Sequence, residues 1–312
     1  MRMFERQGDL QGKRGSFAPE KPSLLLIGLI GLLAGVSCAL IRWRAGNAGD
    51  FGWALSTART LLAGGDPYAF TPDATHIPYP LPVALFGLPL LSLPDYFAAG
   101  IFMGLSSSLL CWGIMKFGRY SMLMLFASGP YFFALTFTQW SPLVTAAWFI
   151  PALAPLLVLI KPQIAIPIAS RKLSLRGLLF AAAILVITLV VYPTWPFRWL
   201  QTIGSFAKTI PVLALPAGPL LLLAALRWRQ AEGRLLLLMA IMPIRSPYDL
   251  LSVFILAKTR KQALSLVILS WVPFFLIQFD LLDDFPMGLY CQVLLLPALW
   301  MLLSPPKPNQ SL

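Results

Sequence analysis

Residues 24–41 read LLLIGLIGLLAGVSCALI, an apolar stretch without a single charged side chain. A helix needs about 17–25 mostly apolar residues to cross a bilayer, and this stretch is long enough. Three further stretches also lack charge, at residues 97–115, 177–191 and 263–277. Backbone groups in lipid must bond within their own segment, so such runs predict helices. The sequence therefore predicts an all-α protein, a polytopic helical bundle in a membrane.

The overall composition supports this class. Of the 312 residues, 58% are hydrophobic and only 12% are charged, with a mean hydropathy of +0.77. Soluble domains carry about 25% charged residues. The net charge of +12 is attributed to basic cytoplasmic loops and not to nucleic-acid binding, because no basic arm with interleaved aromatic residues is present. The three cysteines lie in apolar segments, which favours packing over disulfide or metal binding.

Charge asymmetry predicts the topology. Residues 1–22 are rich in Lys and Arg and are expected in the cytoplasm, followed by a retained first helix. Residues 42–80 form the longest polar stretch and are predicted to be an outer loop. The transmembrane domain is expected to cover residues 23–303, with residues 304–312 as a cytoplasmic tail. These assignments predict a multi-pass protein of the cell membrane with its N-terminus inside.

The number of helices is less well defined by the pattern. Basic clusters at 171–176, 227–234 and 258–261 indicate inner loops. About 10–12 transmembrane or re-entrant segments satisfy the alternation, although this count places Arg119 outside. Some apolar segments, such as residues 235–244, are too short to span and are expected to be re-entrant.

The outer loop begins with an acidic residue at a helix start. Apolar residues recur at helical spacing over residues 50–63, which predicts an amphipathic helix that Gly64 and Gly65 end. Asp50 begins this helix, so an ordinary N-cap is one interpretation of it.

Short motifs follow along residues 45–250. They are Gly49-Asp50-Phe51, Gly64-Gly65-Asp66-Pro67-Tyr68, Pro78-Tyr79-Pro80, Thr138-Gln139-Trp140-Ser141-Pro142, Ile160-Lys161-Pro162-Gln163 and Ser246-Pro247-Tyr248-Asp249. In this order they resemble glycosyltransferase family 87, the polyprenol-phosphate-mannose-dependent mannosyltransferases of the GT-C superfamily. Thr138 stands where that family usually has glycine, Ser141 stands where it usually has asparagine, and this chain is shorter than the typical member.

The resemblance implies a hexosyltransferase with a lipid-phosphate-linked donor. It implies a GT-C-like fold, transfer of a hexose such as mannose with inversion, and a lipid or glycan acceptor at the outer face. Such an enzyme needs a base for the acceptor hydroxyl, and Asp50 is the candidate. The donor is a polyprenyl-phosphate sugar, and no cofactor or metal is expected.

The departing phosphate requires positive charge in a poorly solvated place. Lys161 and Arg245 interrupt apolar sequence, and charge there is costly and usually functional. Lys161 could instead snorkel or pair with a carboxylate. Arg42 and Arg44 lie at a helix end, where anchoring at the interface is the favoured interpretation.

The remaining candidates for substrate binding are Gln139, Tyr68, Tyr79, Asp66 and Asp249. The tyrosines could stack on sugar rings, although interfacial aromatic belts explain them nearly as well. Asp66 and Tyr68 could simply shape a turn with the Gly and Pro between them.

Two other classes of function remain open. A transporter or flippase would also use an intramembrane lysine and proline-broken helices. A non-catalytic relative that binds lipid-linked sugar would keep the same motifs. The long polar outer loop favours transfer. Motifs for metal-bound nucleotide sugars, for ATP and for zinc proteolysis are missing from the sequence.

Overall fold

A computed structural model describes residues 22–69, 79–203, 208–279 and 287–304. The expected cytoplasmic segment before residue 22 and nearly all of the expected tail lie outside these ranges. Within them, every regular element is helical, and one isolated bridge pairs Thr209 with Ile244. The predicted all-α class is therefore confirmed for the part of the chain that is described.

The elements follow one another with short connections. The α-helices are α1 (Leu24–Ala45), α2 (Gly52–Leu62), α3 (Ala84–Gly87), α4 (Asp95–Lys116), α5 (Gly129–Phe137), α6 (Ser141–Ala146), α7 (Ala154–Ile160), α8 (Pro162–Ala169), α9 (Leu175–Val191), α10 (Trp195–Ile203), α11 (Ala231–Ile241), α12 (Arg260–Gln278) and α13 (Met287–Leu303). The 3₁₀ elements are η1 (Gly49–Phe51), η2 (Leu81–Val83), η3 (Leu88–Leu90), η4 (Tyr120–Ala127), η5 (Pro211–Leu213), η6 (Gly218–Arg227) and η7 (Pro247–Leu256).

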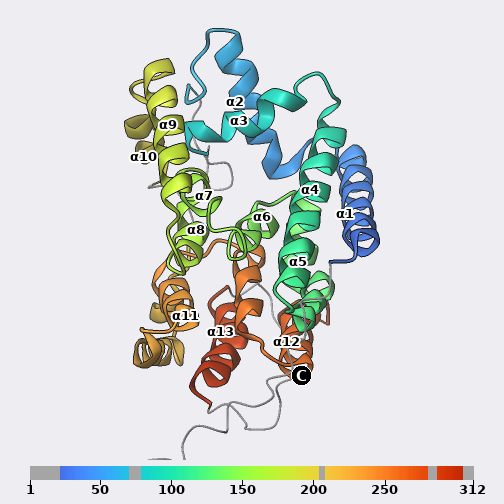
Figure 1. Ribbon diagram of the computed structural model, residues 1–312, viewed down its shortest axis with the longest axis vertical. Helices are drawn as coiled ribbons and strands as arrows, with labels where there is room; N and C mark the ends of the chain where they lie inside the picture. The colour runs from blue at the N-terminus through green and yellow to red at the C-terminus, as the bar shows by residue number, and fades with distance from the viewer. Residues whose placement is uncertain (1–21, 70–78, 204–207, 280–286, 305–312) are drawn as a thin grey trace, which may run out of the picture.

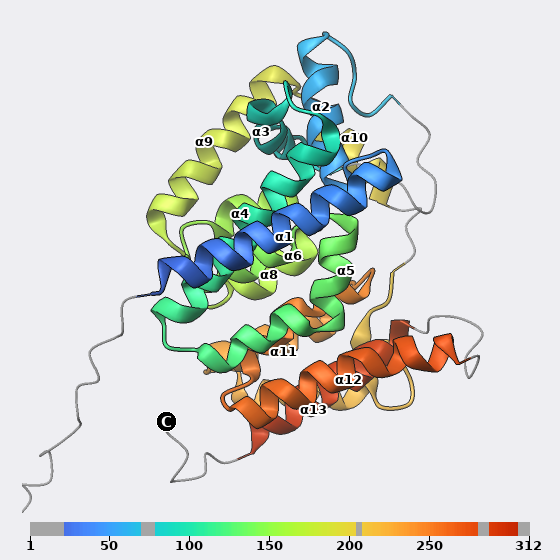
Figure 2. The same ribbon diagram turned by 90° about the vertical axis from the view of Figure 1, so that its right-hand side faces the viewer.

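Helices α1 and α4 are the longest and lie side by side along one side of the molecule (Figures 1 and 2). Glycine allows their close approach: a Cβ atom on Gly100 would lie 2.7 Å from the carbonyl oxygen of Gly35. Small residues are what permits helix backbones to pack tightly in membranes. Ser23 caps the start of α1 through its side chain, and Gly46, with a φ of 67°, ends it.

By length and composition, α1 and α4 qualify as membrane spans. Two bent pairs, η4 with α5 and α9 with α10, raise the total to four if each pair is one span. The expectation of 10–12 spanning or re-entrant segments is not met by this criterion, because proline and short 3₁₀ elements break the apolar sequence into pieces below spanning length. The described helices nevertheless suit a membrane environment.

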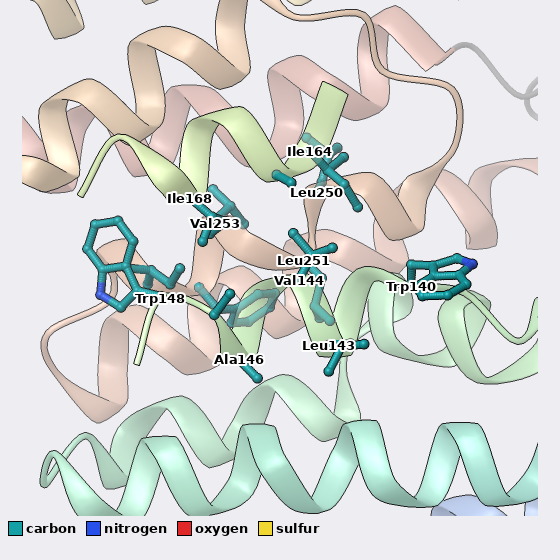
Figure 3. Close-up of a cluster of buried hydrophobic side chains, with 14 of the residues drawn as sticks. Trp140, Leu143, Val144, Ala146, Trp148, Ile164, Ile168, Leu250, Leu251 and Val253 are labelled. Atoms are coloured by element: carbon teal, nitrogen blue, oxygen red, sulfur yellow. The ribbon is translucent and has the colours of Figure 1, made fainter. Parts of the chain in front are cut away.

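The core of the bundle is built around η7, all ten residues of which are buried. Figure 3 shows Leu250, Leu251 and Val253 of this element against side chains from α6 and α8. A charge-poor segment this short and this buried cannot reach both faces of a membrane. The segments expected to be re-entrant, at residues 235–244 and 250–257, correspond to α11 and η7.

The basic residues gather on helix ends. Arg119 donates to the carbonyl oxygens of Ile255 and Ala257, and Arg234 donates to that of Ser170. These contacts place Arg119 beside the basic loops. Arg119 and the loop at 258–261 therefore lie on the same side, which disagrees with a count that places Arg119 outside and that loop inside. In Figure 2, α1, α9 and α12 run in the same general direction, so the first turns of these three helices lie on one side.

Candidate functional site

Asp50 is held at the end of α1 by a compact turn. The side-chain oxygen of Asn47 accepts hydrogen bonds from the backbone of Gly49 at 2.9 Å and from Arg42 Nη1 at 3.0 Å. Gly49 has a φ of 59°, and a Cβ there would lie 2.6 Å from the carbonyl oxygen of Phe137. Only glycine fits both constraints, so the backbone before Asp50 is locked against the end of α5.

Asp50 does not cap the following helix through its side chain. It lies inside η1, and no side-chain capping bond is made at the start of η1 or of α2. The N-cap interpretation of Asp50 is therefore wrong, because the helix opens with a 3₁₀ turn that begins at Gly49. The predicted amphipathic helix itself exists as α2 and ends, as predicted, before Gly64, whose φ is 72°.

Tyr79 binds the carboxylate of Asp50. Its phenol donates a 2.6 Å hydrogen bond to Oδ2 of Asp50, which is partly exposed, whereas Tyr79 is buried. Burial raises the pKa of the Tyr79 phenol well above its usual range, and the negative charge of Asp50 acts in the same direction. The phenol therefore stays protonated and keeps donating, which orients the carboxylate.

Lys161 lies at the break between α7 and α8. It precedes Pro162, which disfavours helical backbone at the residue before it, and its φ and ψ are −138° and 71°. The side chain is 2% exposed, and Nζ donates to Gln139 Oε1 at 2.8 Å. Nζ also forms an ion pair with Asp249 at 3.2 Å. Pairing with a carboxylate, one of the two alternatives to phosphate binding for Lys161, is what the geometry shows.

The backbone just before η7 orients the side chain of Asp249. Its Oδ2 accepts a 3.1 Å hydrogen bond from the backbone N–H of Arg245, while its carboxylate faces Lys161. The charge of Arg245 is near enough to oppose the effect of Asp50 on the pKa of Tyr79. Tyr248, the neighbour of Asp249, places its ring centroid 4.7 Å from Lys161 Nζ. The site thus gathers two carboxylates, two cations and two tyrosines.

An aromatic wall backs this group. Trp140 is fully buried, and its ring centroid lies 5.9 Å from that of Tyr79 and 4.7 Å from that of Phe102. Phe102 stacks on Phe51 at 4.5 Å, which fixes the residue after Asp50 to α4. Such pairs prefer offset or edge contacts at these separations. The wall thus connects Tyr79 to α4 and to the residue after Asp50.

Asp66 and Tyr68 serve the neighbouring turn. Asp66 Oδ1 accepts a 2.8 Å hydrogen bond from the backbone of Tyr68, as in an Asx turn, and Oδ2 pairs with Arg198 at 3.2 Å. The predicted turn is confirmed. Tyr68 donates from its hydroxyl to the carbonyl oxygen of Tyr79 at 3.2 Å, so the turn supports the backbone of the residue that binds Asp50.

Direct contacts join Asp50 to Tyr79 and Lys161 to Gln139 and Asp249. The two groups are neighbours, because Lys161 Nζ lies 6.0 Å from the ring centroid of Tyr79. The sequence motifs quoted above contained Tyr248 and Trp140, but sequence reasoning assigned neither a role. The residues around Tyr248 and Trp140 in the sequence do not indicate that these side chains contact Lys161 and Tyr79. His76, the single histidine of the sequence, lies outside the described residues. In the described part, groups of three or more His, Cys, Asp or Glu that could hold a metal ion are not found.

Comparison with known proteins finds no matching family model, no matching curated protein and no matching solved structure. The fold and the site define a class by themselves: an all-helical protein with apolar helices suited to a membrane and a buried, charge-paired polar cluster. The similarity to glycosyltransferase family 87 rests on the short segments alone.

Proposed function

We propose that this protein is a membrane glycosyltransferase that moves a hexose, mannose in the first instance, from a polyprenyl phosphate to a hydroxyl of a lipid or glycan. The observation that carries the proposal is the contact of Asp50 with Tyr79 beside the group of Lys161, Gln139 and Asp249. Segments far apart in the sequence supply these residues, and they are the same segments that resemble the family.

In this proposal Asp50 is the general base. The acceptor hydroxyl gives its proton to the free oxygen of Asp50 while its oxygen bonds to the anomeric carbon of the sugar. The bond from that carbon to the phosphate oxygen breaks, and the polyprenyl phosphate leaves with the electron pair. Attack opposite the leaving group inverts the anomeric centre. A positioned base contributes about 10²–10⁴-fold to such a step.

The carboxylate of Asp50 suits this role because only one of its oxygens is bonded to Tyr79 and the residue is partly exposed. Tyr79 holds Oδ2, and Asp50 is partly exposed. Arg245 supplies positive charge to the site. Lys161 contributes less net charge than the sequence suggested, because Asp249 pairs with it at 3.2 Å. We assign Lys161, Gln139 and Asp249 to holding the shape of the site.

Thr138 adds support to the resemblance. Its φ is 55°, and it is the only described non-glycine residue with a positive φ. Glycine is the residue that adopts this conformation without steric cost. The position where the family usually carries glycine is thus the position where this backbone favours it.

The direct test is sugar release by the purified protein. Incubation with polyprenyl-phosphate-mannose and a hydroxylated lipid acceptor should yield mannosylated acceptor and polyprenyl phosphate in equal amounts. Polyprenyl-phosphate-glucose in a parallel reaction tests the choice of sugar. Failure to consume any lipid-linked hexose, by protein whose fold is verified, would contradict the proposal.

One observation favours a transporter as second candidate. Lys161 and Asp249 form a buried ion pair at a proline-broken helix, and such intramembrane pairs mark substrate or proton paths in transporters. Proteoliposomes separate the two functions, because a transporter or flippase moves the lipid-linked sugar across the bilayer with its sugar–phosphate bond intact. The binding-only relative would do neither.

The proposed topology completes the account. We place the N-terminus and the loops at 171–176, 227–234 and 258–261 in the cytoplasm, and residues 42–80 outside, in a multi-pass protein of the cell membrane. The positive-inside rule supports this placement. Asp50 would then act at the outer face, where the phosphate of the lipid donor lies.

A further inference from the structure

A groove runs along the outer side of the α1–α4 pair. Its volume is about 670 Å³, and it is lined by residues of these two helices alone, including Gly31, Gly35, Trp43, Gly100 and Gly104. The lining is almost entirely apolar. Because α1 and α4 are the two helices that qualify as membrane spans, the groove lies at the depth of hydrocarbon chains.

The groove suits an elongated apolar chain. Its lining on α1 extends from Gly31 to Trp43, which is about 18 Å at the rise of an α-helix. A hydrocarbon chain laid along the helix axis would meet apolar side chains over this whole length.

A buried cation stands at one end of the same helix face. Arg42 follows Gly35 by seven residues, which is two turns along the glycine face of α1. It is 8% exposed, and its Nη1 donates a hydrogen bond to the neutral amide of Asn47 at 3.0 Å. Within the described ranges, Arg42 Nε has no hydrogen-bond partner and the guanidinium has no carboxylate partner.

The ion pairs found among the described residues do not include Arg42. Asp95 pairs with Arg59, Asp66 with Arg198 and Asp249 with Lys161. A buried charge without a partner is costly, and an anionic ligand offsets that cost. The arginine fork also matches phosphate geometry. Arg42 shares Asn47 with the turn that holds Asp50, so a phosphate there would lie next to the proposed base.

We propose that the α1–α4 groove binds the hydrocarbon chain of a polyprenyl phosphate and that Arg42 binds its phosphate. This inference rests on the proposed function, because it names where the donor lipid lies. It also changes the interpretation of Arg42 from an interfacial anchor to a ligand-binding residue, while exposed Arg44 keeps the anchoring role.

The test uses the full chain in phosphatidylcholine nanodiscs with a polyprenyl phosphate that carries a diazirine in its chain. Photolysis should label peptides of α1 and α4. Unlabelled polyprenyl phosphate should abolish this labelling, and phosphatidylglycerol at equal concentration should not. Labelling confined to other helices, or equal competition by phosphatidylglycerol, would overturn the proposal.

Matched variants separate the chain from the phosphate. Val36→Trp fills the groove and should reduce labelling to the background given by a phosphatidylcholine that carries the same diazirine. Leu33→Trp, at an exposed position of α1 outside the groove, is the control and should not reduce labelling. Arg42→Gln should remove the preference for polyprenyl phosphate over neutral polyprenol, and Arg42→Lys should retain part of it. Arg44→Gln should keep the preference. Equal loss in Arg42→Gln and Arg44→Gln would contradict the role of Arg42.

If Arg42→Gln does not fold, the labelling of Val36→Trp still tests whether the hydrocarbon chain lies in the groove. Sugar release is measured on the same samples. Labelling of α1 and α4 without sugar release would support lipid binding in the groove and contradict the proposed glycosyltransfer. Sugar release with labelling of other helices would support glycosyltransfer and contradict lipid binding in the groove.

Discussion

The phenol of Tyr79 donates a 2.6 Å hydrogen bond to Oδ2 of Asp50, and its ring packs against the fully buried Trp140. This contact joins the turn after α1 to the segment that enters η2. In the proposed mechanism, the other carboxylate oxygen receives the proton of the acceptor.

Tyr79→Phe should slow sugar transfer by roughly 10–100-fold, because a hydrogen bond to a charged group contributes about 1.5–3 kcal/mol. The ring and its contact with Trp140 remain, so the fold should be kept. Initial rates measured at saturating donor check this. Tyr131→Phe is the matched control: it removes another buried phenol hydroxyl, bonded to Ser107 at 2.8 Å, far along the chain from Asp50. An equal loss in both variants would argue against a special role for Tyr79.

Lys161→Met should destabilise the protein strongly. It leaves Asp249 buried without its partner, and breaking a buried pair costs about 3–5 kcal/mol. Lys161→Met combined with Asp249→Leu should recover much of that loss, because replacing both members of a buried pair is often neutral. Denaturant unfolding in a constant detergent checks both variants. A double variant that is less stable than Lys161→Met would show that Asp249 is stabilised by other contacts.

Thr138→Gly should stabilise the protein by about 1 kcal/mol, because a left-handed backbone costs a residue with a Cβ about 1–2 kcal/mol. Loss of the weak contact between the Thr138 hydroxyl and Cys38 Sγ, at 3.3 Å, offsets part of this gain. Thr136→Gly, inside α5, should have the opposite sign, since glycine weakens a helix interior. The free energies of unfolding of the two variants, compared with wild type, give the result. The same sign in both would contradict strain at Thr138.

Cysteine labelling tests the topology. On a background without the three native cysteines, a membrane-impermeant maleimide applied from outside should modify Ala63→Cys and not Lys172→Cys, both at exposed positions. Permeabilised cells supply the control, in which both should react. Labelling of residue 172 but not residue 63 in intact cells would invert the proposed orientation.

Much of the fold follows from local pattern. Charge-free runs predicted α1, α4, α9 and α12 to within a few residues, because a helix in an apolar environment is set by its own segment. The number of spanning elements did not follow. Proline and short 3₁₀ elements such as η7 interrupt the runs, and their depth in the bundle depends on packing against distant segments.

The site was predictable by residue type and not by partner. Lys161 was singled out because charge within apolar sequence is rare, and Asp249 was singled out because its segment resembles the family. Their pairing joins positions far apart in the chain, so the sequence did not predict it. Arg42 looked like an anchor because it lies at a helix end. Arg42 is 8% exposed and bonds Asn47, and no helical period reveals either fact.

The central claim is that Asp50 is the base. The most direct measurement is sugar transfer by purified Asp50→Asn protein compared with wild type, at saturating polyprenyl-phosphate-mannose. Asparagine keeps the shape and still accepts the hydrogen bond from Tyr79, so unfolding and donor binding should change little. The account predicts a rate loss of about 10²–10⁴-fold, since asparagine cannot take the proton of the acceptor. Transfer within about threefold of wild type, far above the ~10²-fold loss expected for a missing base, would contradict it.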